Sequence, residues 1–278
     1  MKNTLTTEEL NELNLITKKL RRQILEMIHN CQSGHPGGSL SAIDILTVLY
    51  TKCLNHYPEN DLNPNYNNRD RFILSKGHAS AALYAILAHC GYFPEAELMT
   101  FRKIGSKLQG HPSSKLLNGV EVSTGSLGQG LSMGCGIALG LRLDNIDSKI
   151  VVYLGDGELQ EGSVWEAAMN ASHQKLKNVI AIVDRNKLQI DGCTENIKSI
   201  GCVASKFKSF GWDTIEINGH DFQEIYAAIE SSKNATKPTV IIANTIKGKG
   251  ISFMENNAGW HGKAPNNEQL QDALKELV

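Results

Sequence analysis

The chain has 278 residues, of which 41% are hydrophobic and 21% are charged, and its formal net charge is −1. This length allows one sizeable α/β domain, and this composition is that of a folded globular protein. A net charge near zero, without a basic block, gives no support for binding nucleic acid or a membrane surface. No apolar run approaches the ~20 residues that span a bilayer.

Cysteine spacing and the N-terminal residues indicate the compartment. Six cysteines, at positions 31, 53, 90, 135, 193 and 202, form no C-x-x-C pair, so neither a zinc site nor a redox motif is indicated. Residues 1–14 are polar and acidic, unlike a signal peptide. We therefore expect a reducing, cytoplasmic location, with the cysteines mostly packed in the core.

The N-terminal half reads as helices around one short strand. Apolar residues at helical spacing predict an amphipathic helix over about 7–30. Three glycines and a proline in residues 33–38 predict a non-helical turn, followed by a helix capped by Ser39 or Ser41 that reaches about Cys53. Further along, we expect a strand at 71–74, a helix at 81–90, a long loop at 105–120, and a helix at 131–143 whose Gly134, Gly136 and Gly140 indicate close packing.

Residues 150–192 are the most informative stretch of the chain. The apolar run Ile150–Leu154 leads into Gly155-Asp156-Gly157, a helical pattern follows from near Glu161, and a second apolar run, 179–183, ends just before Asn186. Strand, turn, helix and strand predict two parallel strands. Asp156 and Asn186 then lie past two strand ends, at the sheet edge where open α/β proteins bind ligands.

The residue types at this edge suit a metal and an anion. One carboxylate, one amide oxygen and a nearby main-chain carbonyl form an incomplete oxygen shell for Mg²⁺ or Ca²⁺, which diphosphate oxygens and water complete. Gly155 and Gly157 let the main chain approach a ligand, and the helix start near Glu161 offers free N–H groups. A bare Gly-Asp-Gly alone favours a plainer reading, in which Asp and Asn are turn formers of a Rossmann-like sheet.

The C-terminal part continues the alternation. We expect helices at 199–210 and 222–231 and strands at 213–217 and 239–244. The segment Lys247-Gly248-Lys249-Gly250 follows, which alone reads as a basic turn. We expect a single α/β domain over residues 1–278, with a mostly parallel central sheet, helices on both faces, and a C-terminal irregular segment plus helix at about 251–278.

Four of the nine histidines lie in Gly/Pro-rich segments: His35, His78, His111 and His261. Alone, each reads as a turn or surface histidine. Together with the other segments they resemble transketolase, because seven motifs follow in that family's order. The motifs are SGHPGG, KGHAS, QGHP, STGSLGQG, GDG with the later DRN, KGKG and GWHGKAP.

The resemblance implies the diphosphate-binding domain of the thiamine diphosphate-binding fold. It also implies thiamine diphosphate with Mg²⁺ (or Ca²⁺) as cofactors, the metal being held by Asp156, Asn186 and the carbonyl of Leu188. By the same resemblance, Gly157 contacts the diphosphate, Gly125 and Leu127 flank the cofactor rings, and Glu161 lies at a subunit boundary. The cofactor-binding set that it implies is His78, Gly125, Leu127, Asp156, Gly157, Glu161, Asn186, Ile190 and His261.

The implied activity is transfer of a two-carbon ketol unit from a ketose phosphate to an aldose phosphate, as in the pentose phosphate pathway. Protons leave and return at hydroxyls and carbonyls during this transfer, which suits imidazoles near neutral pH. The resemblance assigns His35 and His261 to proton transfer. It assigns His78 to diphosphate and substrate contact, and His111 to the C1 hydroxyl of the ketose.

A full transketolase continues into pyrimidine-binding and C-terminal domains, whereas this sequence stops at Val278. We therefore expect a split enzyme with a second subunit that carries those domains, in an α₂β₂ assembly. Several alternatives stay open. They are a split transketolase for branched or unusual sugar phosphates, the α subunit of a 2-oxoacid dehydrogenase E1, a 1-deoxyxylulose-5-phosphate synthase relative, and a non-catalytic cofactor-binding subunit.

Overall fold

A computed structural model describes residues 4–58 and 65–278. At its centre is a five-stranded sheet in the order β1-β2-β3-β7-β6, in which every pairing is parallel. This confirms the predicted α/β fold with a mostly parallel sheet. The strands are β1 (Arg71–Leu74), β2 (Ile150–Gly155), β3 (Val179–Arg185), β6 (Asp213–Asn218) and β7 (Thr239–Asn244).

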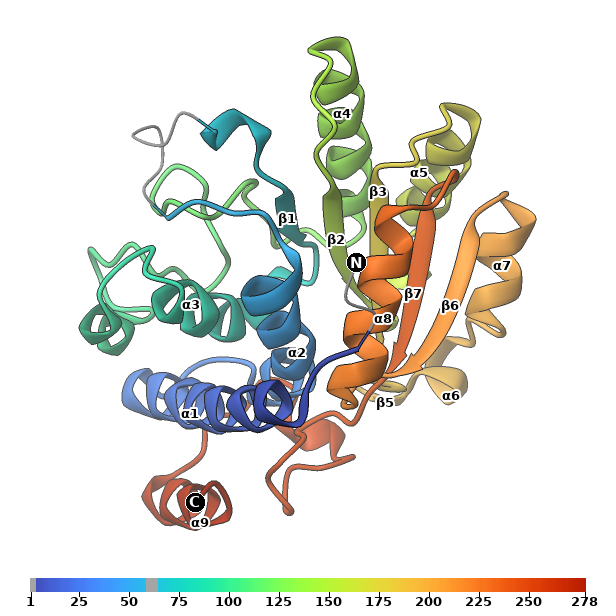
Figure 1. Cartoon of the computed structure of the whole chain (residues 1–278). Coiled ribbons are helices and arrows are strands. Elements are labelled where there is room, and N and C mark those ends of the chain that lie inside the picture. Colours follow the sequence, from blue (N-terminus) through green and yellow to red (C-terminus); the bar gives the residue numbers. More distant parts are fainter. Residues whose placement is uncertain (1–3, 59–64) are drawn as a thin grey trace.

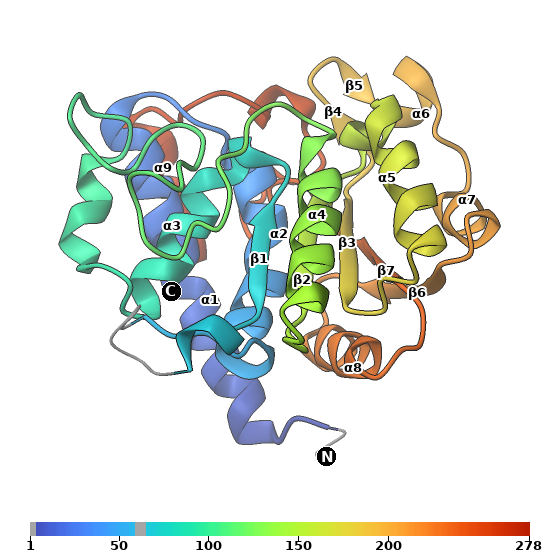
Figure 2. The ribbon, with the colours of Figure 1, turned by 90° about the horizontal axis from the view of Figure 1, so that it is seen from above.

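Helices cover both faces of the sheet (Figures 1 and 2). One hydrophobic cluster joins one face to α1 (Thr7–Cys31), α2 (Pro36–Val48), α3 (Ser80–His89) and α8 (Phe222–Lys233). A second cluster joins the other face to α4 (Gln129–Leu143), α5 (Gly162–His173) and α7 (Val203–Ser209). Alternate strand residues serve the two clusters, since Tyr153 packs in the first and Val152 and Leu154 in the second.

The observed bounds of the strands agree with the prediction to within two residues. The helix expected at 199–210 is shorter, since α7 covers only Val203–Ser209. A separate short helix, α6 (Thr194–Lys198), precedes it, and an irregular link joins the two. The sequence reading missed a small antiparallel hairpin, β4 (Leu188–Gln189) and β5 (Gly192–Cys193). The expected long loop contains neither helix nor strand over 105–120, and the terminal helix is α9 (Asn267–Glu276).

The turn predicted at residues 33–38 is wrong for its second half, because α2 begins at Pro36. Proline suits the first helical position, where its missing N–H has no helical partner to lose. Gly37 lies in the first turn of the helix. A glycine is needed at this position, because a Cβ there would meet the Trp260 carbonyl oxygen at 2.9 Å and Lys247 Cγ at 3.0 Å. His35 is the N-cap residue of α2, in place of the predicted serines.

The cysteines and the helices bear on the predicted compartment. All six cysteines are free, but only Cys53 and Cys135 are buried, and Cys202 is exposed. The expectation that most of them pack in the core is therefore wrong. Within residues 4–58 and 65–278, no helix combines the length and the apolar character needed to cross a membrane.

The glycines of α4 differ in their surroundings, although the sequence grouped them together. A Cβ at Gly134 would lie 2.6 Å from Val152 Cγ2 on the sheet, whereas Gly136 and Gly140 have no atom of the described residues within 4 Å. The predicted close packing therefore holds for Gly134 and is wrong for the other two within this chain. Gly134 lets the helix approach β2 closely.

We expect Gly134→Ala to lower the free energy of unfolding by about 1–3 kcal/mol, because the added methyl overpacks the contact with Val152. Gly136→Ala is the matched control on the same helix. It should leave stability unchanged or raise it by up to about 1 kcal/mol, since alanine loses less backbone entropy on folding. Urea unfolding of both variants measures the difference, and equal effects would contradict this account of the helix–sheet contact.

Candidate active site

A cavity of about 360 Å³ opens at the carboxyl ends of the strands, with walls from the segments that follow β1, β2, β3 and β7. It contains every residue that the sequence reading named for the site. These are His35, His78, His111, Gly125, Leu127, Asp156, Gly157, Glu161, Asn186, Leu188, Ile190 and His261. The segments after β1, β2, β3 and β7 leave the same edge of the parallel sheet, and the start of α2 and the loop before α4 add His35, His111, Gly125 and Leu127 there.

Asp156 and Asn186 both line this cavity and are buried, with 2% and 5% of their surface exposed. The Asp156 carboxylate accepts hydrogen bonds from the N–H groups of Gly157 (2.8 Å) and Lys187 (2.5 Å) and from Arg185 Nη1 (3.1 Å). Burial raises the pKa of Asp156, and the nearby charge of Asp184 adds to the effect. A divalent cation at this carboxylate would offset both costs, so the residues present fit the predicted metal.

The described residues contain no group of three His, Cys, Asp or Glu side chains able to hold a metal by themselves. A cation at Asp156 and Asn186 would complete its oxygen shell with the Leu188 carbonyl, with water or with a bound molecule such as the diphosphate of the implied cofactor. Close packing requires a glycine at one position of the cavity wall. Gly125 has a φ of +149°, and a Cβ there would lie 3.2 Å from the His111 ring.

Three of the four histidines form a cluster. The ring centroids of His35 and His78 are 5.2 Å apart, those of His78 and His261 are 5.2 Å apart, and those of His35 and His261 are 5.5 Å apart. The Nδ1 atoms of His35 and His261 are buried without a hydrogen-bond partner among the described residues. His111 is more exposed and lies against Gly125 instead.

Burial lowers the pKa of these histidines, and nearby positive charges lower it further. The pKa of His35 falls to about 4 and that of His261 to about 3, and the pKa of His78 is well below its usual value. The cluster is therefore uncharged at neutral pH. A neutral imidazole accepts a hydrogen bond or a proton at one nitrogen and donates from the other, which suits proton transfer to and from a bound substrate.

A buried ion pair supports the cavity from below. Lys76 Nζ lies 2.5 Å from Asp184 Oδ2 and donates to the Gly38 carbonyl oxygen at 2.9 Å. Asp184 also accepts hydrogen bonds from Ser41 Oγ (2.7 Å) and from Thr245 Oγ1. Burial alone would raise the pKa of Asp184, but the Lys76 charge and these hydrogen bonds lower it. The pair thus joins β1, α2, β3 and the end of β7.

The sequence reading gave no site role to Lys76, Glu158 or Lys247, which also line the cavity. Glu158 is 2% exposed and accepts hydrogen bonds from the N–H groups of Gly128 (2.8 Å) and Gly155 (2.9 Å). Lys247 is also 2% exposed, and burial lowers its pKa to about 8. The sequence held one signal that could have identified them, because all three residues come shortly after the carboxyl end of a predicted strand.

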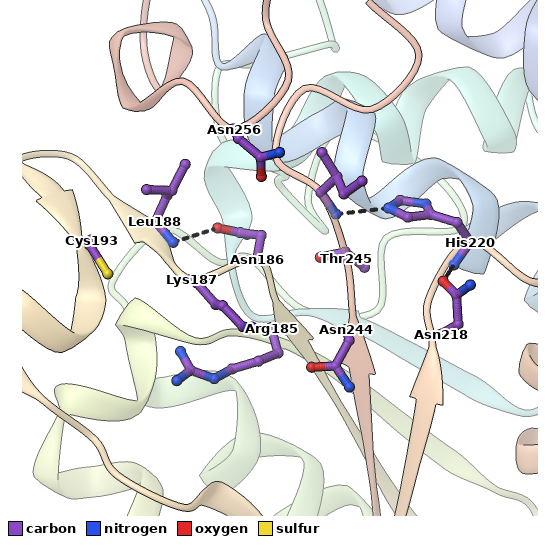
Figure 3. A pocket seen from close by; sticks show the side chains of 11 residues that line it. Arg185, Asn186, Lys187, Leu188, Cys193, Asn218, His220, Asn244, Thr245 and Asn256 are labelled. Atoms are coloured by element: carbon purple, nitrogen blue, oxygen red, sulfur yellow. Dashed lines mark hydrogen bonds between the residues drawn. The ribbon is translucent and has the colours of Figure 1, made fainter.

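A second hollow of about 390 Å³ lies beside the first, at the ends of β3, β7 and β6 (Figure 3). Asn186 and Leu188 form a wall common to both. Most polar groups of the second hollow already bind other parts of the protein. Both ring nitrogens of His220 are hydrogen-bonded, and Arg185 pairs with Asp156 and Glu195. Few groups there remain free for a ligand, so we place the candidate site in the first cavity.

Known proteins are similar to this chain in sequence and in fold. The family described as "Transketolase, thiamine diphosphate binding domain" matches residues 13–277. The chain is 40% identical to one subunit of the apulose-4-phosphate transketolase of Phocaeicola vulgatus, over 97% of this chain and 95% of that protein. It is 42% identical to a 6-deoxy-6-sulfo-D-fructose transketolase subunit from a Clostridium species, over 93% of each chain.

The crystal structure of transketolase from Campylobacter jejuni superposes with a TM-score of 0.88 at 39% identity, over 95% of this chain and 42% of that one. The chain therefore belongs to the family of transketolase thiamine diphosphate-binding domains, and the family predicted from the motifs is confirmed. It is similar to separate transketolase subunits over nearly their full length, and it spans less than half of the one-chain enzyme.

We expect Lys76→Met to destabilise the protein by about 3–5 kcal/mol at neutral pH, because it leaves the Asp184 carboxylate buried without its cation. In this variant burial raises the pKa of Asp184 above its ordinary value of 3.8, so the penalty grows as pH rises and shrinks toward pH 4. In the wild type the pKa is lowered, so ionised Asp184 stabilises above 3.8 and this contribution fades as pH falls through the lowered pKa.

Urea unfolding between about pH 4 and pH 8 measures the effect of Lys76→Met. Lys103→Met, at an exposed lysine, is the control and should change stability by less than about 0.5 kcal/mol. A loss for Lys76→Met that stays constant across this pH range would show that the pairing with Asp184 is not its cause.

Proposed function

We propose that this chain is the thiamine diphosphate-binding subunit of a two-subunit transketolase, which transfers a two-carbon ketol unit between sugar phosphates. The observation that carries the proposal is the single cavity in which Asp156 and Asn186 face the cluster of neutral histidines. The family match over residues 13–277 supports the same function. The site roles of individual residues are part of this proposal.

In this proposal, Asp156, Asn186 and the Leu188 carbonyl hold Mg²⁺ or Ca²⁺, and Gly157 approaches the diphosphate without a Cβ in the way. His78 and Lys247 also face the diphosphate. Gly125, Leu127 and the exposed side chain of Ile190 contact the cofactor rings, and Glu161 lies toward the neighbouring subunit. Thiamine diphosphate, when bound, supplies the carbon nucleophile and the electron sink.

The histidines orient the sugar and carry its protons. His35 and His261 accept and return protons at the hydroxyl and carbonyl oxygens of the sugar, which their low pKa values permit because the rings start uncharged. His78 contacts both diphosphate and substrate, and His111, on the long loop, binds the C1 hydroxyl of the ketose. His35, His261 and His78 are half-buried, so water competes less than in bulk solvent for their hydrogen bonds to the substrate.

A partner subunit carries the remaining domains in this proposal. The support is that relatives named as single subunits of a transketolase match this chain over 93–97% of its length, whereas the one-chain enzyme is more than twice as long. We propose an α₂β₂ assembly, since most soluble oligomers adopt closed symmetry. A cytoplasmic location is supported by six free cysteines.

Two groups of sugars are candidate substrates. The family as a whole favours the common ketose phosphates. Two relatives are named for apulose 4-phosphate and for 6-deoxy-6-sulfo-D-fructose, and these names favour an unusual sugar instead. An unusual sugar phosphate is therefore the alternative substrate, because those relatives are similar to this chain over almost its full length.

Reconstitution tests this function. The chain alone, given thiamine diphosphate, Mg²⁺, xylulose 5-phosphate and ribose 5-phosphate, should form no sedoheptulose 7-phosphate. Addition of the second subunit, sought in the neighbouring reading frame, should start turnover with one of the donors in a panel that includes apulose 4-phosphate and 6-deoxy-6-sulfo-D-fructose. Robust turnover without any partner would contradict the two-subunit proposal, and the preferred donor decides between the two groups of sugars.

We expect Asp156→Ala to abolish Mg²⁺-dependent binding of thiamine diphosphate, because it removes the charged protein ligand of the metal. Isothermal titration calorimetry with and without Mg²⁺ measures the affinity, and circular dichroism checks the fold. Asp144→Ala, at the exposed end of α4, is the control and should bind as the wild type does. Unchanged affinity in folded Asp156→Ala protein would refute the metal assignment.

In the reconstituted enzyme, His35→Ala and His261→Ala should each lower kcat by ~10²–10⁴-fold while the fold survives, because each removes a group that moves a proton. His173→Ala, at the exposed end of α5, is the matched control and should keep full turnover. Steady-state rates per folded active site measure the loss of kcat in each variant. A variant that lost stability but kept its turnover would reduce that histidine to a packing role.

A further inference from the structure

The Lys247 side chain is largely buried, and its ammonium opens onto the cavity without a bonded partner among the described residues. Its ammonium makes no hydrogen bond or ion pair with any of them, although the side chain is only 2% exposed and lines the cavity. The stem of the side chain crosses the start of α2, where a Cβ on Gly37 would lie 3.0 Å from its Cγ and 3.3 Å from its Cε. A lysine in this position has to be held there, because burial of an unpaired ammonium is unfavourable.

The main chain on either side of Lys247 is tied to the same carboxylate. Ile246 N–H donates to His220 Nε2 at 2.8 Å, and His220 Nδ1 donates to Asp44 Oδ2 at 2.7 Å. On the other side, the Lys249 carbonyl oxygen accepts from Arg21 Nε at 3.0 Å, and Arg21 Nη2 donates to Asp44 Oδ2 at 2.6 Å. Figure 3 shows the His220 ring and its hydrogen bond to this segment.

The three side chains of this network come from distant parts of the sequence. Arg21 is on α1, Asp44 is on α2, and His220 is in the turn before α8. Arg21 and Asp44 are 8% and 4% exposed, and none of the three residues lines the cavity of the candidate site. Because His220 Nε2 accepts from a main-chain N–H, Nδ1 must carry the ring proton, so the ring joins Ile246 to Asp44 in its neutral form.

We propose that Arg21, Asp44 and His220 are positioning residues, which hold the Lys247 ammonium in the cavity by fixing the main chain at Ile246 and Lys249. The ligand that this ammonium meets is a phosphate-bearing group, so the inference rests on the function proposed above. The arrangement has a physical reason. A short segment tied at both ends keeps the lysine from turning out to solvent, where its charge would be better hydrated.

Two substitutions of His220 separate positioning from packing. His220→Gln places an amide near the position of Nε2 and keeps an acceptor for Ile246 N–H. His220→Asn places an amide near the position of Nδ1, so it keeps the hydrogen bond to Asp44 and loses the one to Ile246. The probe is Mg²⁺–pyrophosphate, titrated calorimetrically into the full chain, and thermal unfolding reports the stability of each variant.

We expect His220→Asn to weaken pyrophosphate binding by about 10-fold or more, and Lys247→Met to weaken it at least as much, since a hydrogen bond from a cation to a phosphate is strong. His220→Gln keeps the acceptor for Ile246 N–H and loses only the hydrogen bond to Asp44, so it should weaken binding clearly less than His220→Asn does. In the Lys247→Met background, His220→Asn should cause no further loss, because the two residues act through one ammonium. Arg21→Lys, which loses the donor to Lys249, should resemble His220→Asn.

Equal losses for His220→Asn and His220→Gln would overturn the proposal, and so would losses that add in the double variant. Arg21→Lys provides the same test if His220→Asn does not fold, and unchanged binding by it would also overturn the proposal. A different result marks failure of the proposed function. If the wild type does not bind Mg²⁺–pyrophosphate, or if Asp156→Ala binds it equally well, the cavity is not a diphosphate site and the positioning role falls with it.

Discussion

The buried pair of Lys76 and Asp184 is the interaction on which the geometry of the cavity depends. Asp184 stands near the end of a central strand, where it is fully buried and has no access to bulk water. The carboxylate is tolerable there because the ammonium and two hydroxyl groups surround it. Those partners come from the segment after β1, from α2 and from the segment after β7, so one carboxylate links three separate segments that line or support the cavity.

The electrostatics above this pair follow from the same burial. Lys76 and Lys247 place positive charge beside three crowded imidazoles, and the low dielectric keeps the imidazoles uncharged. The cavity thus separates two tasks. In the function that we propose, lysines and a metal at Asp156 would meet an anionic ligand, while neutral histidines would remain free to exchange protons with a sugar. Protonated histidines would disturb this arrangement, because their positive charges would repel one another and the nearby charges of Lys76 and Lys247.

The start of α2 shows how one segment serves both packing and function. Gly37 and Gly38 were read as helix breakers, yet they lie in the first helical turn with Lys247 and His78 against them. Their missing side chains make room for functional groups. The helix tolerates them because tertiary contacts outweigh the propensity cost of about 1 kcal/mol per glycine. Local sequence rules failed here because the decisive neighbours are more than 30 residues away.

The sequence by itself determined the fold class, the strands of the central sheet and most of the residues that line the candidate site, but not Lys76, Glu158 or Lys247. Continuous apolar runs and period-3.6 patterns report burial directly, and seven motifs in family order identified the transketolase domain. Only the tertiary structure decided that His35, His78 and His261 are neutral, that Gly136 and Gly140 are open, and that Lys247 lies inside the cavity. Each of these properties depends on which groups from distant segments surround a residue, and no local pattern encodes those neighbours.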